Sequence, residues 1–149
     1  MKPVQHVILS TGVSVLFWLW LKSLPATIVC FLSGIFIDID HHLEYWFVKK
    51  KFPWNYRELE KYCCEEFLER IYLIFHAYEW LVLLWAAIYI FDLDVVWVGL
   101  GVGLTTHLIA DVLCNPIQPL GYSIIFRASR GFCGRRILTE RYEKEHPTM

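Results

Sequence analysis

The sequence predicts an all-α membrane protein, a bundle of four transmembrane helices with an interfacial amphipathic helix and a basic C-terminal tail. Of its 149 residues, 56% are hydrophobic and only 19% are charged, and the mean hydropathy is +0.41. This composition is more apolar than that of an ordinary soluble domain. Four stretches of 18 to 21 residues are apolar almost throughout: 4–21, 24–41, 71–91 and 95–114. About 20 helical residues cross a hydrocarbon core of roughly 30 Å, so each stretch can span it or nearly so.

The first stretch is predicted to be a retained helix and not a cleaved signal peptide. It follows Met1 and Lys2, but its bulky end, Leu-Phe-Trp-Leu-Trp-Leu at 16–21, lacks the small residues of a cleavage site. No internal repeat is visible, so we expect residues 1–149 to form a single membrane-embedded domain.

The connection between the second and third stretches is predicted to contain a surface helix. Asn55 and Glu58 have the spacing of a capping box. Apolar residues follow at helical spacing on one face: Leu59, Tyr62, Cys63 and Phe67. After the fourth stretch, Asn-Pro at 115–116 and Pro-Leu-Gly at 119–121 interrupt helical structure. We therefore expect an interfacial loop and a basic tail there.

Lysine and arginine are distributed unequally between the two sides of the predicted bundle. Thirteen of the 14 precede the first stretch, lie between the second and third, or follow the fourth, and only Lys22 lies on the other side. Because the side rich in Lys and Arg is retained in the cytoplasm, both termini are predicted to be cytoplasmic in a multi-pass protein of the inner cell membrane.

Two classes of protein are disfavoured by composition. The formal net charge of -1 provides no overall positive field, so nucleic acid is not an expected partner. The five cysteines include no CxxC pair, which argues against a disulfide framework and against a thiolate zinc site.

Ionisable residues occur in all four predicted spans, although each costs about 2.5–3.5 kcal/mol at the centre of a membrane helix. They are four histidines and four acids: His6, Asp38, Asp40, His41, His76, Glu79, His107 and Asp111. In the alternating topology all eight lie toward the cytoplasmic face, which predicts one functional site there.

Small and polar residues repeat along single helix faces. One row at i+4 spacing consists of Gly99, Gly103, His107 and Asp111. Small residues let helices approach closely in lipid, so such rows are expected to face each other within the chain and to direct the ligands inward.

The cluster has the chemistry of a multinuclear metal site. Asp38, Asp40 and Asp111 lie at predicted helix C-termini, where the helix dipole is already negative and a bound cation would compensate the carboxylates. Eight candidate ligands exceed the needs of one tetrahedral ion. We expect two or more divalent ions, with zinc as the first choice and manganese or iron as alternatives. The alternative readings are a polar cluster without metal and a Glu79 that pairs with a basic residue.

Taken in chain order, these motifs resemble those of the YdjM-like family of membrane-bound metal-dependent hydrolases, within a superfamily of zinc-dependent phospholipases C and nucleases. The matching elements are His6, Asp38-Ile-Asp40-His41, His76, and Gly103-Leu-Thr-Thr-His107-Leu-Ile-Ala-Asp111 with its following Pro and Gly loop. The resemblance implies that residues 1–149 form a metal-dependent hydrolase domain. Many members carry a second histidine shortly after the third-helix histidine, where this chain has Glu79.

The expected reaction is hydrolysis of a phosphoester of a phospholipid or lipid phosphate by metal-activated water. Asp38, Asp40, His107 and Asp111 are the expected catalytic residues. A site at headgroup depth suits a membrane lipid as substrate. Arg127 and Arg130 are expected to hold its phosphate, because a guanidinium pairs bidentately with such oxygens. Anchoring on anionic lipid is the other role open to these arginines.

Two functions from other classes stay open. The cluster could be the transit site of a metal carrier or transporter, although the ligands lie toward one face and no inverted repeat is visible. It could also be a structural metal site in a non-enzymatic membrane protein. The oligomeric state and the ester that is cleaved are not predicted.

Overall fold

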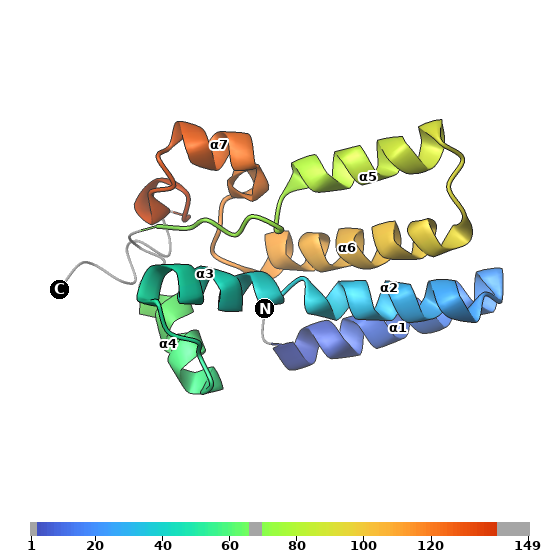
Figure 1. Ribbon diagram of the computed structural model, residues 1–149, viewed down its shortest axis with the longest axis horizontal. Helices are drawn as coiled ribbons and strands as arrows, with labels where there is room; N and C mark the ends of the chain where they lie inside the picture. Colours follow the sequence, from blue (N-terminus) through green and yellow to red (C-terminus); the bar gives the residue numbers. More distant parts are fainter. Residues whose placement is uncertain (1–2, 66–69, 140–149) are drawn as a thin grey trace. The chain divides into compact units, whose positions relative to one another are not determined.

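The computed structural model describes residues 3–65 and 70–139, in which every regular element is a helix (Figure 1). The α-helices are α1 (Pro3–Leu21), α2 (Leu24–Phe36), α3 (Ile39–Lys49), α4 (Tyr56–Glu65), α5 (Tyr78–Ile90), α6 (Val95–Cys114) and α7 (Ile124–Ser129). Two short 3-10 helices are η1 (Pro119–Tyr122) and η2 (Gly134–Arg136). The described residues contain two isolated β-bridges and no strand. The all-α prediction is confirmed.

The chain divides into two compact units, each built from two separate stretches of sequence. Unit 1 comprises Met1–Asp38 and Tyr78–Cys114, and unit 2 comprises the described parts of Ile39–Ala77 and Asn115–Met149. Unit 1 contains α1, α2, α5 and α6, whereas unit 2 contains α3, α4, α7 and both 3-10 helices.

Within residues 3–65 and 70–139, three helical segments are long and apolar enough to cross a membrane by length and composition, where four spans are predicted. They are Pro3–Leu21, Leu24–Lys49 and Val95–Cys114, the second of which includes α2, the turn after it and α3. The predicted third span at 71–91 is shorter as a helix, since α5 has 13 residues and begins at Tyr78. The chain thus has the helices of a membrane protein, but the prediction of four full spans needs correction.

Segment 71–77 is not helical because its backbone forms hydrogen bonds with buried charged side chains. The backbone N–H of Tyr72 donates to Glu44 Oε1 at 2.7 Å, and that of Phe75 donates to Asp40 Oδ2, also at 2.7 Å. The Arg127 guanidinium donates to the carbonyls of residues 73 and 76. Backbone without helical bonds is tolerated in an apolar setting only where such partners replace them. Hydropathy alone does not show that side chains replace the helical hydrogen bonds of this segment.

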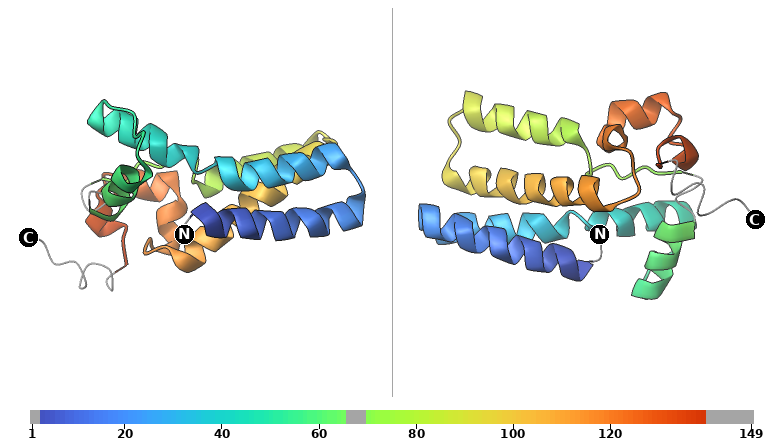
Figure 2. Two further views of the ribbon diagram at one scale, coloured as in Figure 1. Left: turned by 90° about the horizontal axis from the view of Figure 1, so that it is seen from below. Right: turned by 180° about the vertical axis from the view of Figure 1, so that it is seen from behind.

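In unit 1, α1, α2 and α6 contact one another and α5 packs on α6 (Figures 1 and 2). The apolar core centres on Phe17, Ala26 and Cys30. Gly99 and Gly103 of α6 lie directly against α2, where a Cβ atom on either would collide with a backbone carbonyl oxygen, that of Ala26 or that of Cys30. The row of small residues therefore packs within the chain, as predicted, and lets α2 and α6 approach closely.

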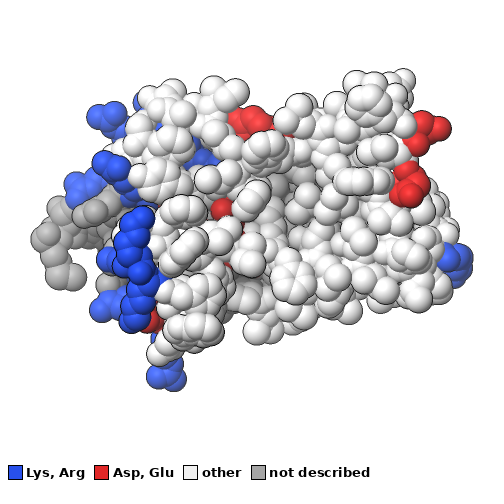
Figure 3. Space-filling model, viewed as in Figure 1, with Lys and Arg blue, Asp and Glu red and all other residues white. Residues whose placement is uncertain are grey.

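The surface of unit 1 is apolar while its helix interfaces are partly polar. The buried residues of α1 are His6, Ser10, Ser14 and Phe17. Its exposed side chains include Ile8, Leu16 and Trp20, the last with 76% of its surface accessible. The face of unit 1 in Figure 3 carries few charged side chains. Large exposed apolar surfaces mark contact with lipid or with another protein.

Unit 2 is held together by α3 packed on α4 and by the extended segment bonded to the C-terminal loops. Tyr45 of α3 meets Tyr62 of α4 edge to face, with ring centroids 5.1 Å apart. Further along, Ile71 N donates to Phe132 O at 2.9 Å. The exposed Lys and Arg side chains of unit 2 form a basic surface, part of which is blue in Figure 3: Lys49, Lys50, Lys51, Arg57, Lys61, Arg70, Arg130, Arg135 and Arg136.

The predicted surface helix exists as α4, and its cap differs in one detail from the expected box. Asn55 Oδ1 accepts from Arg57 N at 3.0 Å, as an N-cap should. Glu58 instead accepts from the Tyr45 hydroxyl at 2.6 Å and from Lys51 Nζ at 3.1 Å, which together hold the pKa of Glu58 below its usual value. Leu59 and Tyr62, two residues of the predicted apolar face, are buried in the structure, while Phe67 lies outside the described residues.

The close approach of α2 and α6 predicts a large effect of a single methyl group at Gly99. Gly99→Ala places a Cβ atom against the rigid Ala26 carbonyl, and overpacking of this kind costs about 1–3 kcal/mol. The apparent Tm in detergent should fall. Gly12→Ala is the matched control, because a Cβ there meets nothing within 4 Å and the change should be neutral or stabilising. Equal Tm values for the two variants would contradict this packing.

Candidate metal centre

Four of the predicted ligands converge inside unit 1. His6 comes from the first turn of α1, Asp38 from the end of the turn after α2, and His107 and Asp111 from successive turns of α6. One ligand atom from each lies within 4.8 Å of the others. His6, His107 and Asp111 are 1–2% exposed, and Asp38 is partly exposed. This group, His6–Asp38–His107–Asp111, is called the four-residue centre below.

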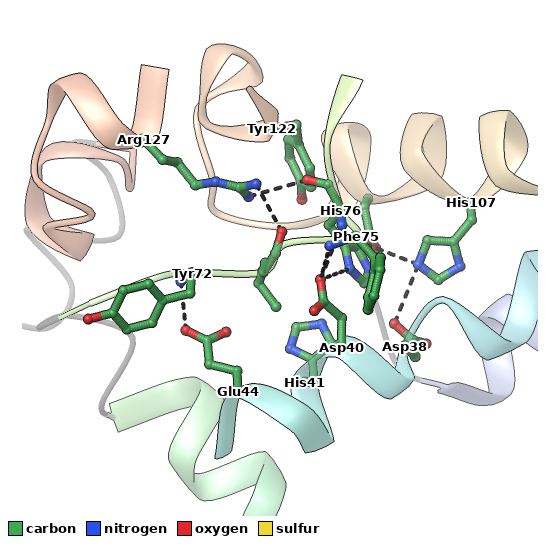
Figure 4. A network of polar contacts seen from close by, with 12 residues as sticks. Asp38, Asp40, His41, Glu44, Tyr72, Phe75, His76, His107, Tyr122 and Arg127 are labelled. Carbon is green, nitrogen blue, oxygen red and sulfur yellow. Dashed lines mark hydrogen bonds and ion pairs between the residues drawn. The ribbon is translucent and has the colours of Figure 1, made fainter. Parts of the chain in front are cut away.

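The imidazole of His107 lies between two carboxylates. Its Nε2 is 3.4 Å from Asp38 Oδ1 and 3.3 Å from Asp111 Oδ2 (Figure 4 shows the Asp38 contact). Its Nδ1 is 2.9 Å from the carbonyl oxygen of Gly34. A carbonyl can only accept, so Nδ1 donates to it, and Nε2 is the nitrogen that faces the two acids. Two carboxylates and one imidazole nitrogen therefore face one point, and this arrangement could hold a metal ion.

His6 of α1 completes the centre. Its ring stacks on that of His107 with centroids 3.9 Å apart and an interplanar angle of 13°. Its Nε2 lies 3.2 Å from Asp111 Oδ1, whereas Nδ1 is buried without a hydrogen-bond partner among the described residues. The two oxygens of Asp111 are thus each directed to a different imidazole. Such a carboxylate can bind one ion with both oxygens or bridge two ions.

The separations between these atoms are compatible with ligation of one metal ion. Atoms about 2.0–2.1 Å from a tetrahedral ion are roughly 3.3–3.4 Å from one another. Charge-assisted N–H···O bonds are shorter, about 2.7–2.9 Å. The observed distances of 3.2–3.4 Å lie close to the first value. The donor set of two imidazoles and two carboxylates is one that zinc, manganese and iron accept.

Three further predicted ligands lie in unit 2. Asp40 Oδ2 accepts from the N–H of Phe75, from the N–H of His76 at 3.1 Å and from His76 Nδ1 at 3.2 Å (Figure 4). The rings of His41 and His76 meet at an angle with centroids 5.1 Å apart. A carboxylate that bonds to Nδ1 orients the ring and directs Nε2 to a metal. Asp40 has the contacts of such a positioning residue.

The remaining predicted site residues occupy different surroundings. Glu79 is in the first turn of α5, half-buried, and is not part of the four-residue centre. Arg127 is fully buried, and its guanidinium donates to Leu73 O at 2.9 Å and to His76 O at 3.2 Å. Arg130 is exposed above the ring of Phe126. Substrate binding by the two arginines stays a prediction. Arg127 also holds the backbone carbonyls of Leu73 and His76 in place.

The sequence alone did not identify Glu44, and it gave Cys63 no role near the site. Glu44 is 4% exposed and lies one turn after Asp40 on the same face of α3. Helical periodicity could therefore have identified it. Cys63 Sγ lies 3.7 Å from His41 Nδ1. Nothing local in the sequence signals that contact, because it joins α3 to α4 across 22 positions.

Comparisons with protein-family models, with curated proteins and with solved structures find no match to this chain. The resemblance to the YdjM-like hydrolases stays a prediction.

The two carbonyl contacts of Arg127 predict that its loss destabilises the fold. Arg127→Gln leaves buried backbone acceptors without a charged donor, at a cost of about 2–3 kcal/mol. The control Arg130→Gln removes an exposed guanidinium and should cost less than about 1 kcal/mol. Thermal denaturation in detergent compares the two. A Tm unchanged by Arg127→Gln would contradict the structural role.

Proposed function

We propose that this protein is an integral membrane metal-dependent hydrolase that cleaves a phosphoester of a phospholipid or lipid phosphate at the cytoplasmic face of the membrane. The observation that carries the proposal is the four-residue centre, in which two imidazoles and two carboxylates are gathered among apolar helices. The alternatives of a metal carrier and of a structural metal site use the same residues, so turnover must distinguish them.

Charge balance supports a divalent ion at this centre. Two carboxylates and two neutral imidazoles carry a formal charge of about -2, and burying uncompensated charge costs several kcal/mol per ion. A divalent cation removes the whole of that charge, and the orientation of His107 by Gly34 already presents Nε2 for ligation. Zinc is the first choice, with manganese or iron as alternatives. His41 and His76 are the imidazoles that unit 2 offers to a second ion.

The centre is also suited to hydrolysis. When bound, a divalent ion supplies a Lewis acid and activates water near neutral pH. Asp38, whose side chain is 25% exposed, is the most accessible member, so water and substrate would reach the centre beside it. Asp111 and His107 hold the inner side, and Asp40 positions His76. A catalytic metal site needs such an accessible position, which a closed structural site lacks.

Two features support a lipid as the substrate. The exposed side chains of the unit 1 helices are largely apolar, as expected of surfaces in hydrocarbon. The excess of Lys and Arg in unit 2 and before α1 supports a cytoplasmic position of those segments under the positive-inside rule. The basic surface of unit 2 would attract anionic headgroups, and Arg130 is an exposed member of it.

The proposal predicts stoichiometric metal in the purified protein. Elemental mass spectrometry of wild type in detergent should find at least one transition-metal ion per chain. Asp38→Asn and His107→Ala should each weaken metal affinity by about tenfold or more, since they remove ligands. His42→Ala is the control, because His42 is outside the four-residue centre. Protein that stays metal-free after incubation with zinc, manganese or iron would refute the centre.

The proposal also predicts turnover that depends on the bound metal. Metal-loaded protein in mixed micelles should release phosphate or a phosphoalcohol from a panel of phospholipids and lipid phosphates. Asp38→Asn should lower kcat/KM by about 100-fold or more, because it alters the accessible side of the centre. Bound metal without turnover of any lipid phosphoester would favour a structural site, and ion uptake into liposomes would favour a carrier.

A further inference from the structure

Unit 2 contains an open groove whose lining includes Asp40, the residue that positions His76, and Glu44, which has no role above. Its volume is about 610 Å³, within the range of small-molecule sites. One wall is the face of α3 that carries Leu43 and Phe47, and Tyr62 of α4 adjoins it. The other wall is the extended segment from Arg70 to Phe75. The lining is mostly apolar, so its occupant must be mostly apolar too.

Glu44 gives this apolar groove one specific polar feature. Its side chain lines the groove and is 4% exposed. Oε1 accepts from Tyr72 N at 2.7 Å, and the backbone N–H of Leu73 also stabilises the carboxylate, while Oε2 is buried and meets no donor in full hydrogen-bond geometry among the described residues (Figure 4). A buried carboxylate oxygen without a donor is costly, so the groove is built for a ligand that brings one.

Neither a bound water nor a metal ion is a good partner for Glu44 Oε2. A buried water needs two to four polar partners. Among the other polar side chains of the lining, Asp40 is already bonded to Phe75 N and His76, and Arg70 to the Tyr72 hydroxyl. The His, Cys, Asp and Glu groups with metal-ligand spacing, among the residues described, do not include Glu44. A donor attached to an apolar body meets both requirements of the groove.

Positive charge stands on the rim of the same groove. Arg70 lines it and is exposed, and its Nη1 donates to the Tyr72 hydroxyl at 3.0 Å. Tyr72 therefore contacts Glu44 through its backbone and Arg70 through its side chain. An anionic group at Arg70 and a cationic donor at Glu44 would complement the two charges.

We propose that the groove binds one molecule of a phosphatidylethanolamine lipid. The ammonium donates to Glu44 Oε2, the phosphate pairs with Arg70, and an acyl chain lies along the apolar walls. The helical span Leu24–Lys49 contributes Glu44 and would bring the groove within reach of membrane lipid. This inference does not depend on hydrolysis, and binding can be measured on metal-free protein.

A headgroup series tests the proposal on the full-length wild-type protein. Native mass spectrometry in detergent would give the dissociation constants of lysophosphatidylethanolamine, lysophosphatidylcholine and lysophosphatidylglycerol with one acyl chain. The choline head keeps the charges but has no N–H donor. Wild type should bind the ethanolamine lipid about tenfold or more tightly than the other two. Equal binding of all three, or no saturable binding, would overturn the proposal.

A variant assigns the preference to the groove. Glu44→Gln keeps the size and the acceptor for Tyr72 N, but replaces the negative oxygen, so the preference for ethanolamine should vanish. Glu58→Gln is the matched control, since Glu58 belongs to the same unit but does not line the groove, and it should keep the preference. A preference that survives Glu44→Gln in folded protein would also overturn the proposal.

Discussion

The close contact of α2 with α6 is the constraint on which the four-residue centre depends. Gly99 and Gly103 allow α6 to touch the backbone of α2, and one turn beyond them His107 reaches the carbonyl of Gly34 at 2.9 Å. That single hydrogen bond sets the tautomer of the ring and directs Nε2 between Asp38 and Asp111. A side chain at either glycine would move the helices apart. The close packing of α2 on α6 is therefore also what allows His107 to reach Gly34.

The parts of this arrangement that follow local periodicity could be predicted from sequence. The i+4 row from Gly99 to Asp111 predicted one interior face of α6, and Asn55 predicted the start of α4. The extended segment 71–77 could not be predicted, because its sequence is apolar like that of a span. Its hydrogen-bond partners are Glu44, Asp40 and Arg127, which are distant in sequence. Secondary structure there is decided by long-range contacts and not by propensity.

The two acids of the Asp38-Ile-Asp40 motif lie in different units for a related reason. Asp38 and Asp40 are two positions apart, yet Asp38 contacts His107 in unit 1, whereas Asp40 binds the backbone and ring of His76 in unit 2. The turn between α2 and α3 separates them, and no periodic signal locates it. Sequence reasoning treated both acids as equivalent ligands. Their contacts distinguish a carboxylate that faces one imidazole nitrogen from one already surrounded by N–H donors.

The buried charge of unit 1 is the reason why this centre could hold a divalent metal ion. A proton on one imidazole would leave the two carboxylates with a formal net charge of about -1 among apolar helices. It would also lie on only one of the two stacked rings, whereas both rings direct Nε2 toward Asp111. A divalent ion neutralises both acids at once and accepts lone pairs from both imidazoles. The geometry that is costly without a counter-ion is therefore one that could hold a divalent cation.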